Sequence, residues 1–309
     1  MPGLLDQVRA SAAATARSAT FVVIQEDALE AYAASLPLEA ARAPELDPAT
    51  HFLGDRAATL AYLVQLDAIN FGSGYFPRLK KRPALSGYFT VASSLKERFE
   101  ACGPFSTDQL QELTPNACAR IFGQELGADA AVDELMGLFA RALNDLGSYV
   151  DSRFGGSFGA LVDAAEGRAE RLVGMLAQMP FYRDVGFYKR AQLTAADLSV
   201  AHVATFSDLD RLTIFADNLV PHVLRVDGIL GYEPELLERI NRAELIPSGS
   251  IEELEIRSCA VHAVELIAQA LRTRGQPATC MQLDYVLWNR GQASAYKAQP
   301  RHRTRSVFY

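Results

Sequence analysis

One carboxylate interrupts an apolar run in the second half of the chain, in the segment LTIFADNLVPHVLR at residues 212–225. Burying an unpaired charge costs several kcal/mol, so Asp217 needs either a partner or a chemical role. One role is a cap on a helix over residues 219–226, with Pro221 in its first turn. The other is catalysis, since apolar flanks lower the local dielectric and strengthen the effect of a carboxylate on a nearby cation. The two roles are compatible, because a cap fixes the direction of the carboxylate and helix-end N–H groups favour its ionised form.

A second carboxylate lies among aromatic residues, in the segment CMQLDYVLWN at residues 280–289. Asp284 and Trp288 are four residues apart and share one face of an expected helix, with Tyr285 beside the carboxylate. A carboxylate offers two acceptor oxygens to the adjacent N–H donors of a purine-like ring, and aromatic side chains stack on the faces of such a ring. A buried amphipathic helix without any ligand explains the same pattern equally well.

Two adjacent basic residues, Lys189 and Arg190, lie at the beginning of another expected helix, over residues 188–204. Cations are disfavoured at the positive end of a helix dipole. An anion bound beside them would relieve that conflict. A pair of solvated charges is an equally good interpretation of the two residues.

The loop that follows an expected helix over residues 55–69 carries Asn70 and Phe71, with two more aromatic residues at positions 75 and 76. Asn70 suits the end of a helix that is followed by a tight turn. Such a turn does not require several aromatic rings on one loop, where they suit a planar ligand. We therefore expect Asn70 and Phe71 to lie near a ligand.

Three other patterns suggest a phosphate-binding loop, a metal site or cysteine chemistry, but the residues around them do not support these functions. Residues 72–74 read GSG but follow a helix rather than a strand, which argues against a phosphate-binding loop. His262 and Glu265 are three residues apart on one helix face, but no second pair of metal ligands accompanies them. The four cysteines are scattered and lack a catalytic or metal-binding spacing. We expect neither a metal ion nor a cofactor.

The elements that must position these residues are overwhelmingly helical, as judged from apolar periodicity and start signals. The predicted helices span residues 55–69, 86–101, 131–154, 168–179, 188–204, 219–226, 234–241, 250–271 and 279–288, with two short helices after Ser106 and Thr114. The best candidate for a strand is residues 20–24. We predict an all-α fold, as one compact unit of residues 1–309 or as two closely packed halves, 1–155 and 156–309.

Composition narrows the class of protein further. Of the 309 residues, 49% are hydrophobic, which is ample for a large core. The net charge is −7, from 30 basic and 37 acidic residues, whereas proteins that bind nucleic-acid polymers normally carry a basic excess. No segment approaches the roughly 18 apolar residues of a membrane span. The scattered cysteines and the lack of a secretory signal favour the cytoplasm. We expect disorder only at the two ends, including the polar residues 298–305.

Several motifs occur in one order along most of the chain. They are LDAINF (66–71), SGYF (86–89), FYKRAQ (187–192), LTIFAD (212–217) with VP (220–221), and LDYVLW (283–288). With these motifs the sequence resembles the queuosine salvage proteins, the queuosine 5′-phosphate N-glycosylase/hydrolase family, over roughly residues 20–290. The resemblance implies hydrolysis of queuosine 5′-monophosphate, which releases queuine and ribose 5-phosphate. It also implies a fold similar to the helical DNA glycosylases of the helix–hairpin–helix class.

The likeness to DNA glycosylases has one clear departure. Those enzymes place a basic residue on one helix and an essential Asp at the start of the next, and Lys189 and Asp217 look similar. They also carry a glycine-rich hairpin that grips the DNA backbone, but the corresponding residues 205–212 read TFSDLDRL and are net acidic. We therefore expect a glycosylase-like architecture that lacks this hairpin and acts on a free nucleotide, not on DNA or intact tRNA.

The resemblance assigns roles to the residues singled out above. Positive charge builds up on the ribose as an N-glycosidic bond breaks, so Asp217 is the expected catalytic group, as nucleophile, cation stabiliser or general base. Queuine is a 7-deazaguanine and a poor leaving group, and Asp284 is assigned to its N–H edge. The other expected substrate-binding residues are His51, Phe215, Tyr285 and Trp288 for the base, and Lys189, Arg190 and Arg225 for the phosphate. The competing interpretation is a non-catalytic helical protein that binds a modified nucleoside.

Overall fold

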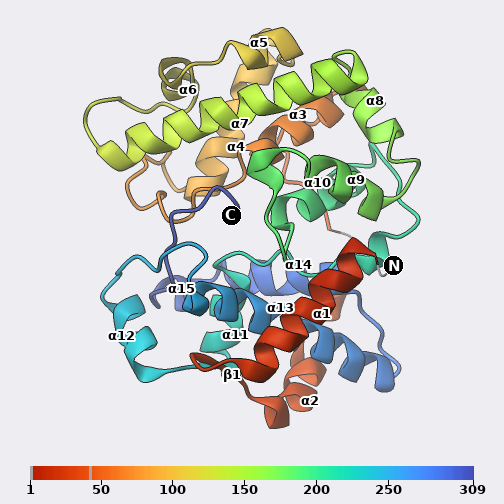
Figure 1. Ribbon diagram of the computed structural model, residues 1–309, viewed down its shortest axis with the longest axis vertical. Coiled ribbons are helices and arrows are strands. Elements are labelled where there is room, and N and C mark those ends of the chain that lie inside the picture. Colours follow the sequence, from red (N-terminus) through yellow and green to blue (C-terminus); the bar gives the residue numbers. More distant parts are fainter. Residues whose placement is uncertain (1–2, 42–43) are drawn as a thin grey trace. The chain divides into compact units, whose positions relative to one another are not determined.

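The computed structural model describes residues 3–41 and 44–309, which are predominantly helical (Figure 1). Within those ranges one small sheet of two strands is present, so the predicted all-α fold is confirmed. None of the helices described there is long and apolar enough to cross a membrane. The chain forms two compact units. Unit 1 consists of Met1–Pro44, Val185–Lys189 and Asp208–Arg305, and unit 2 consists of Glu45–Asp184, Arg190–Ser207 and Ser306–Tyr309.

The position at which the sequence suggested two halves lies inside unit 2. Gly155 ends a long helix there with a left-handed backbone (φ 58°), which glycine adopts without strain. The interruption of the helical pattern at this point is therefore a helix terminus. A division of the chain at residue 155 stays a prediction.

Unit 1 is organised around the buried helix α13 (Ile251–Thr273). Ser250 caps this helix by accepting a hydrogen bond from the backbone N–H of Glu253. Helix α1 (Leu4–Ser18) packs along α13 (Figure 1). The other elements of unit 1 are β1 (Val22–Ile24), α2 (Glu26–Ser35), η1 (Leu38–Ala41), η3 (Leu209–Arg211), α11 (Val220–Val226), β2 (Leu230–Tyr232), α12 (Pro234–Asn241), α14 (Cys280–Arg290) and α15 (Ser294–Lys297).

A buried carboxylate attaches the chain after α1 to the central helix. Glu255 on α13 accepts hydrogen bonds from the backbone N–H groups of Thr20, Phe21 and Val22, at 3.0, 2.6 and 3.2 Å. Hydrogen bonds to an ionised acceptor are about twice as strong as neutral ones. These bonds hold the start of β1 on α13, where β1 pairs antiparallel with β2.

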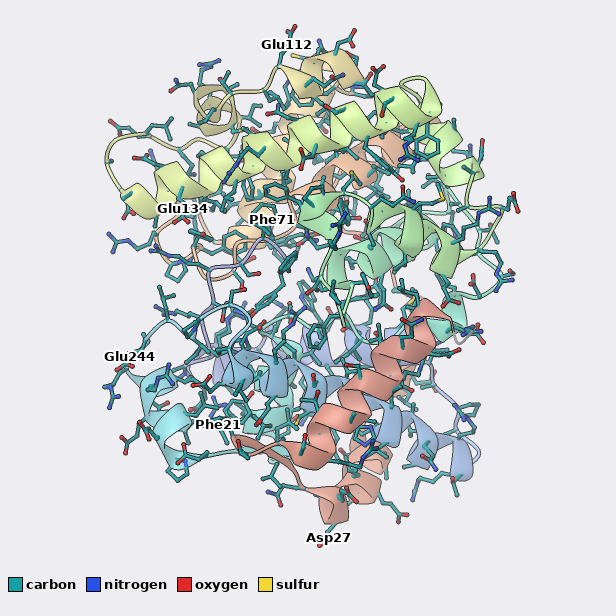
Figure 2. All side chains as sticks on the ribbon, viewed as in Figure 1. Phe21, Asp27, Phe71, Glu112, Glu134 and Glu244 are labelled. Atoms are coloured by element: carbon teal, nitrogen blue, oxygen red, sulfur yellow. The ribbon has the colours of Figure 1, made fainter. Side chains whose placement is uncertain are left out.

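Unit 2 is organised along α7 (Ala130–Phe154), a long amphipathic helix. Asp129 caps it by accepting a hydrogen bond from the backbone N–H of Ala131. Phe139 on the buried face of α7 contacts Phe71, whose side chain is labelled in Figure 2, with ring centroids 5.2 Å apart. The other elements of unit 2 are α3 (Arg56–Ala68), α4 (Gly87–Cys102), α5 (Thr107–Gln111), α6 (Pro115–Ile121), α8 (Phe158–Asp163), α9 (Ala169–Leu176), η2 (Pro180–Tyr182) and α10 (Lys189–Val200), whose first residue is assigned to unit 1.

The expectation of disorder in residues 298–305 is wrong. His302 and Thr304 are buried, at 1% and 0% exposed, and the backbone N–H of Ile246 donates to the carbonyl of Arg303 at 2.8 Å. This polar segment therefore belongs to the folded part of unit 1. At the other end, residues 1–2 lie outside the described residues.

Candidate active site

Asp217 lies in an irregular segment between η3 and α11. Its Oδ1 accepts hydrogen bonds from the backbone N–H groups of Leu219 and Val220, at 2.7 and 3.2 Å. Asp217 therefore binds the start of α11 as expected, although the N-cap position itself is Leu219. Pro221 lies in the first turn of α11, as expected. Asp217 is half-buried, whereas the four residues before it are buried. The carboxylate is thus the part of this segment that remains accessible to a ligand.

Asp284 on α14 is held directly against the Asp217 segment. Its Oδ1 accepts a hydrogen bond of 2.8 Å from the backbone N–H of Phe215, although the two residues are 69 positions apart. The side chain is only 5% exposed. Burial raises the pKa of Asp284 to about 7, and the neighbouring Asp217 carboxylate adds to this shift, whereas the Phe215 N–H and Lys189 oppose it. The structure therefore brings these four predicted residues together in unit 1.

Lys189 is a buried cation close to the Asp284 carboxyl group. Lys189 begins α10 and is 6% exposed, so the interpretation as a solvated charge is wrong. Tyr188 before it adopts a left-handed backbone (φ 50°), and Phe187 packs under the guanidinium of Arg257 at 3.9 Å. Lysine is rarely buried without an anionic neighbour. The Asp284 carboxyl group is such a neighbour.

Arg190 is also buried, at 1% exposed, but its contacts lie in unit 2. Its guanidinium donates to the backbone carbonyls of Asp67 and Ala68, at 3.1 and 2.6 Å, and to that of Phe181. Burial lowers the pKa of Arg190 to about 10. The structure thus shows Arg190 holding the end of α3, and its predicted contact with a phosphate stays a prediction.

The third predicted phosphate ligand, Arg225, faces the C-terminal segment of unit 1. It lies in the last turn of α11 and donates to the carbonyl of Pro300 at 2.8 Å and to Nδ1 of His222 at 3.2 Å. The sequence indicated that Arg225 reaches Asp217 only if its side chain curls back. In the structure the guanidinium binds Pro300, so its role as a phosphate ligand stays a prediction.

The aromatic residues expected near Asp284 lie on the same helix. Thr279 begins α14 with a capping box, which fixes the helix start one turn before Asp284. Tyr285 and Trp288 are half-buried, and Trp288 packs on the hydrophobic core of unit 1. Both therefore keep part of their surface accessible, as stacking on a planar base requires.

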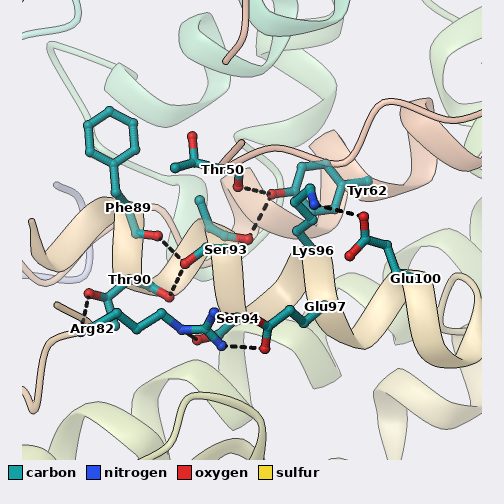
Figure 3. Close-up of polar contacts among 11 residues, drawn as sticks. Thr50, Tyr62, Arg82, Phe89, Thr90, Ser93, Ser94, Lys96, Glu97 and Glu100 are labelled. Carbon is teal, nitrogen blue, oxygen red and sulfur yellow. Dashed lines mark hydrogen bonds and ion pairs between the residues drawn. The ribbon is translucent and has the colours of Figure 1, made fainter. Parts of the chain in front are cut away.

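Three predicted substrate-binding residues belong to unit 2. His51 is buried and bonds through Nε2 to the Tyr88 hydroxyl at 2.9 Å, and burial lowers its pKa. Figure 3 shows the adjoining network, in which the Tyr62 hydroxyl donates to the carbonyl of Thr50. Asn70 and Phe71, the other two, follow α3, and Phe71 is buried. Their contacts with a base stay predictions.

Comparison with known proteins decides the family. Residues 50–309 match the family described as queuosine salvage protein. The chain belongs to this family. It is 37% identical over 305 residues to a protein of Sphaerobacter thermophilus, with 93% of each chain covered. It is 32% identical over 267 residues to one of Dictyostelium discoideum, covering 81% of this chain and 78% of that one, and 30% identical over 308 residues to one of Mus musculus, covering 89% and 90%. All three relatives are named queuosine 5′-phosphate N-glycosylase/hydrolase.

In this queuosine salvage protein, Arg257 binds the backbone of the segment that carries Asp217, although the sequence did not single this residue out. Arg257 on α13 is buried and donates from Nε to the carbonyl of Ala216 at 2.9 Å, while its Nη1 lies 3.3 Å from buried Glu253. The signal was present as an oppositely charged pair four residues apart in an apolar helix. What the sequence did not show is which carbonyl the arginine would bind.

Proposed function

We propose that this chain hydrolyses the N-glycosidic bond of queuosine 5′-monophosphate and releases queuine and ribose 5-phosphate. The observation that carries the proposal is the pairing of Asp217 with Asp284 through the backbone of Phe215. Family membership and the names of the relatives agree with it. The proposed substrate is a free nucleotide rather than a nucleic-acid polymer, and the proposed location is the cytoplasm.

Asp217 acts on the ribose in this proposal. Breaking the bond between C1′ and the base leaves an oxocarbenium-like sugar, which a carboxylate beside the ring stabilises. Both backbone bonds to Asp217 end on Oδ1, and Oδ2 accepts no hydrogen bond from any residue of the described ranges. The cap therefore fixes one oxygen and leaves the other to face C1′ or a water molecule.

Asp284 acts on the leaving base. The Phe215 N–H holds its Oδ1, and a pKa of about 7 means that both protonation states exist near neutral pH. The ionised form accepts N–H donors from the guanine-like edge, and the neutral form donates a proton to the base as it departs. Tyr285 and Trp288 keep part of their ring surface accessible for stacking on the base, whereas the ring of Phe215 is only 4% exposed, so Phe215 contributes its backbone N–H to the site. In the balanced reaction, the oxygen of water bonds to C1′ and the base gains one hydrogen.

The direct test is to incubate the purified protein with queuosine 5′-monophosphate and to measure free queuine by liquid chromatography and mass spectrometry. We expect Asp217→Asn to lower turnover by roughly 100-fold or more, since a charge next to the developing cation is lost. Asp163→Asn, an exposed carboxylate at the end of α8, is the matched control and should turn over normally. Unchanged turnover of Asp217→Asn would refute the catalytic assignment. Thermal stabilisation by the nucleotide without any base release would favour the non-catalytic alternative.

Product stereochemistry separates the roles that Asp217 can play. In water–methanol mixtures, methanol competes with water for C1′ and yields methyl ribose 5-phosphate. Retention of the β configuration indicates a covalent adduct with Asp217, because two displacements occur. Inversion indicates a single displacement in which Asp217 activates the attacking molecule or stabilises the cation.

A further inference from the structure

Residues 298–305, called the C-terminal segment below, are tied to both ends of α11. Arg225 in the last turn of α11 donates to the carbonyl of Pro300 at 2.8 Å. Asn218, just before the helix, donates from Nδ2 to the carbonyl of His302 at 3.4 Å. The segment thus runs along α11 in the direction opposite to the helix, and its backbone reaches the residue that follows Asp217.

These bonds place a cationic side chain near the candidate catalytic carboxylate. Asn218 follows Asp217 directly, and His302 follows Arg301 directly. Because the Asn218–His302 bond joins their neighbours, Arg301 and Asp217 lie in the same part of unit 1. Their side chains are close enough for the Asp217 carboxylate to stabilise the charge on Arg301.

The guanidinium of Arg301 differs from those of Arg225 and Arg257 in having no bond to another residue of the described ranges. Arg225 binds Pro300, and Arg257 binds Ala216 and Glu253. Arg301 keeps an exposed surface although protein surrounds much of its guanidinium, and no hydrogen bond or ion pair engages that group among the described residues. A guanidinium in that state keeps its donors free for an external anion.

A second arginine, Arg303, lies near enough to Arg301 to affect its ionisation. Desolvation by the surrounding protein lowers the pKa of Arg301, the Asp217 carboxylate opposes this, and the nearby Arg303 adds to the lowering. Burial lowers the pKa of His302, between the two arginines, to about 3, and the charges of Arg257 and Arg301 add to that shift. Like charges held together in this way are stabilised by a bound anion.

We propose that Arg301, assisted by Arg303, binds the 5′-phosphate of the substrate and gives the enzyme its preference for a nucleotide over a nucleoside. This inference rests on the proposed function. The phosphate is attached to the same ribose whose C1′ faces Asp217, so a cation beside Asp217 is within reach of it. A guanidinium binds a phosphate through two parallel hydrogen bonds, and a phosphate monoester carries a charge between about −1.5 and −2 at pH 7.

The test compares queuosine 5′-monophosphate with queuosine, the same molecule without the phosphate. We expect Arg301→Gln to lower kcat/KM for the nucleotide by roughly 10- to 100-fold, the range for hydrogen bonds to a charged group, and to lower it much less for queuosine. Arg301→Lys keeps the charge but loses the paired donors, so its ratio should be intermediate. Arg274→Gln, an exposed arginine at the end of α13, is the control and should keep the native ratio.

A second measurement separates this inference from the proposed function. Calorimetric titration with ribose 5-phosphate measures the phosphate site without any bond cleavage, and circular dichroism verifies that each variant is folded. Loss of ribose 5-phosphate binding in Arg301→Gln supports the site even if the native protein releases no queuine, which would refute only the proposed function. Equal losses for nucleotide and nucleoside, or native binding of ribose 5-phosphate by Arg301→Gln, would overturn the assignment of Arg301 while queuine release by the native protein still stands.

Discussion

Replacing Asp284 with Asn removes a carboxyl group that the fold holds in an unfavourable environment, so we expect the variant to be more stable than the native protein above pH 7. The amide has nearly the same shape, and its oxygen can still accept the hydrogen bond from the Phe215 N–H. The substitution therefore changes the ionisation of the site with little change in its packing. It should also lower queuine release, because Asn neither donates a proton to the base nor carries the charge.

The size of the effect follows from the pKa of Asp284. In the unfolded chain the group titrates at an ordinary value of 3.8, and in the folded protein at about 7. At low pH both states are protonated and ionisation costs nothing. As the pH rises through this window the unfolded state loses its proton first, so folding stability falls, by about 2 kcal/mol at pH 5 and about 4 kcal/mol above pH 7. The Asp284→Asn variant carries no such penalty at any pH.

Urea unfolding followed by circular dichroism at pH 5 and pH 8 measures this difference. The free energy of unfolding of Asp284→Asn minus that of the native protein should increase by about 2.5 kcal/mol between the two conditions. Any loss from the altered hydrogen bond is the same at both values and cancels. Asp163→Asn should show no comparable increase. A difference for Asp284→Asn that is equal at pH 5 and pH 8 would refute the raised pKa.

Three further predictions address the groups around Asp284. Asp217→Asn should lower the pKa of Asp284, because it removes a neighbouring negative charge. Carbon-13 NMR of the Asp284 carboxyl group measures this pKa, and an unchanged value would show that the two groups do not interact. Asp217→Ala should cost about 1 kcal/mol of unfolding free energy through loss of the cap on α11, measured by urea unfolding, whereas a cost near zero would contradict the capping role. Arg257→Leu should lower the free energy of unfolding by roughly 3 to 5 kcal/mol, because buried Glu253 loses its partner. Adding Glu253→Gln should restore part of that free energy. No recovery would show that the arginine stabilises the fold only through its bond to Ala216.

Local rules predicted much of the secondary structure, because many helix starts are encoded in a few neighbouring residues. Ser106 and Thr114 cap α5 and α6, and Thr279 caps α14, as the sequence indicated. Helix α1 was missed, since it is rich in Ala and Ser and buries only a narrow apolar face. Its burial against α13 is a tertiary contact that the local pattern does not define.

The candidate site was predicted in its parts but not in its assembly. Residue types and apolar flanks singled out Asp217 and Asp284, yet their pairing depends on how α14 packs against the segment around Phe215. Residues 298–305 gave the opposite error: a polar composition predicts exposure, but it does not show that Asn218 and Ile246 bind this segment through its backbone. Composition reports the side chains, whereas these bonds use the main chain.

The donor that orients Asp284 is the backbone N–H of Phe215, which every substitution at this position except proline retains. The ring of residue 215 can therefore be changed without removing the group that holds the acid in place. The side chain at position 215 and the orientation of the Asp284 carboxyl group can thus be varied separately. Under the proposed function, a library limited to position 215 would vary the surroundings of the base while its members inherit an already oriented carboxyl group.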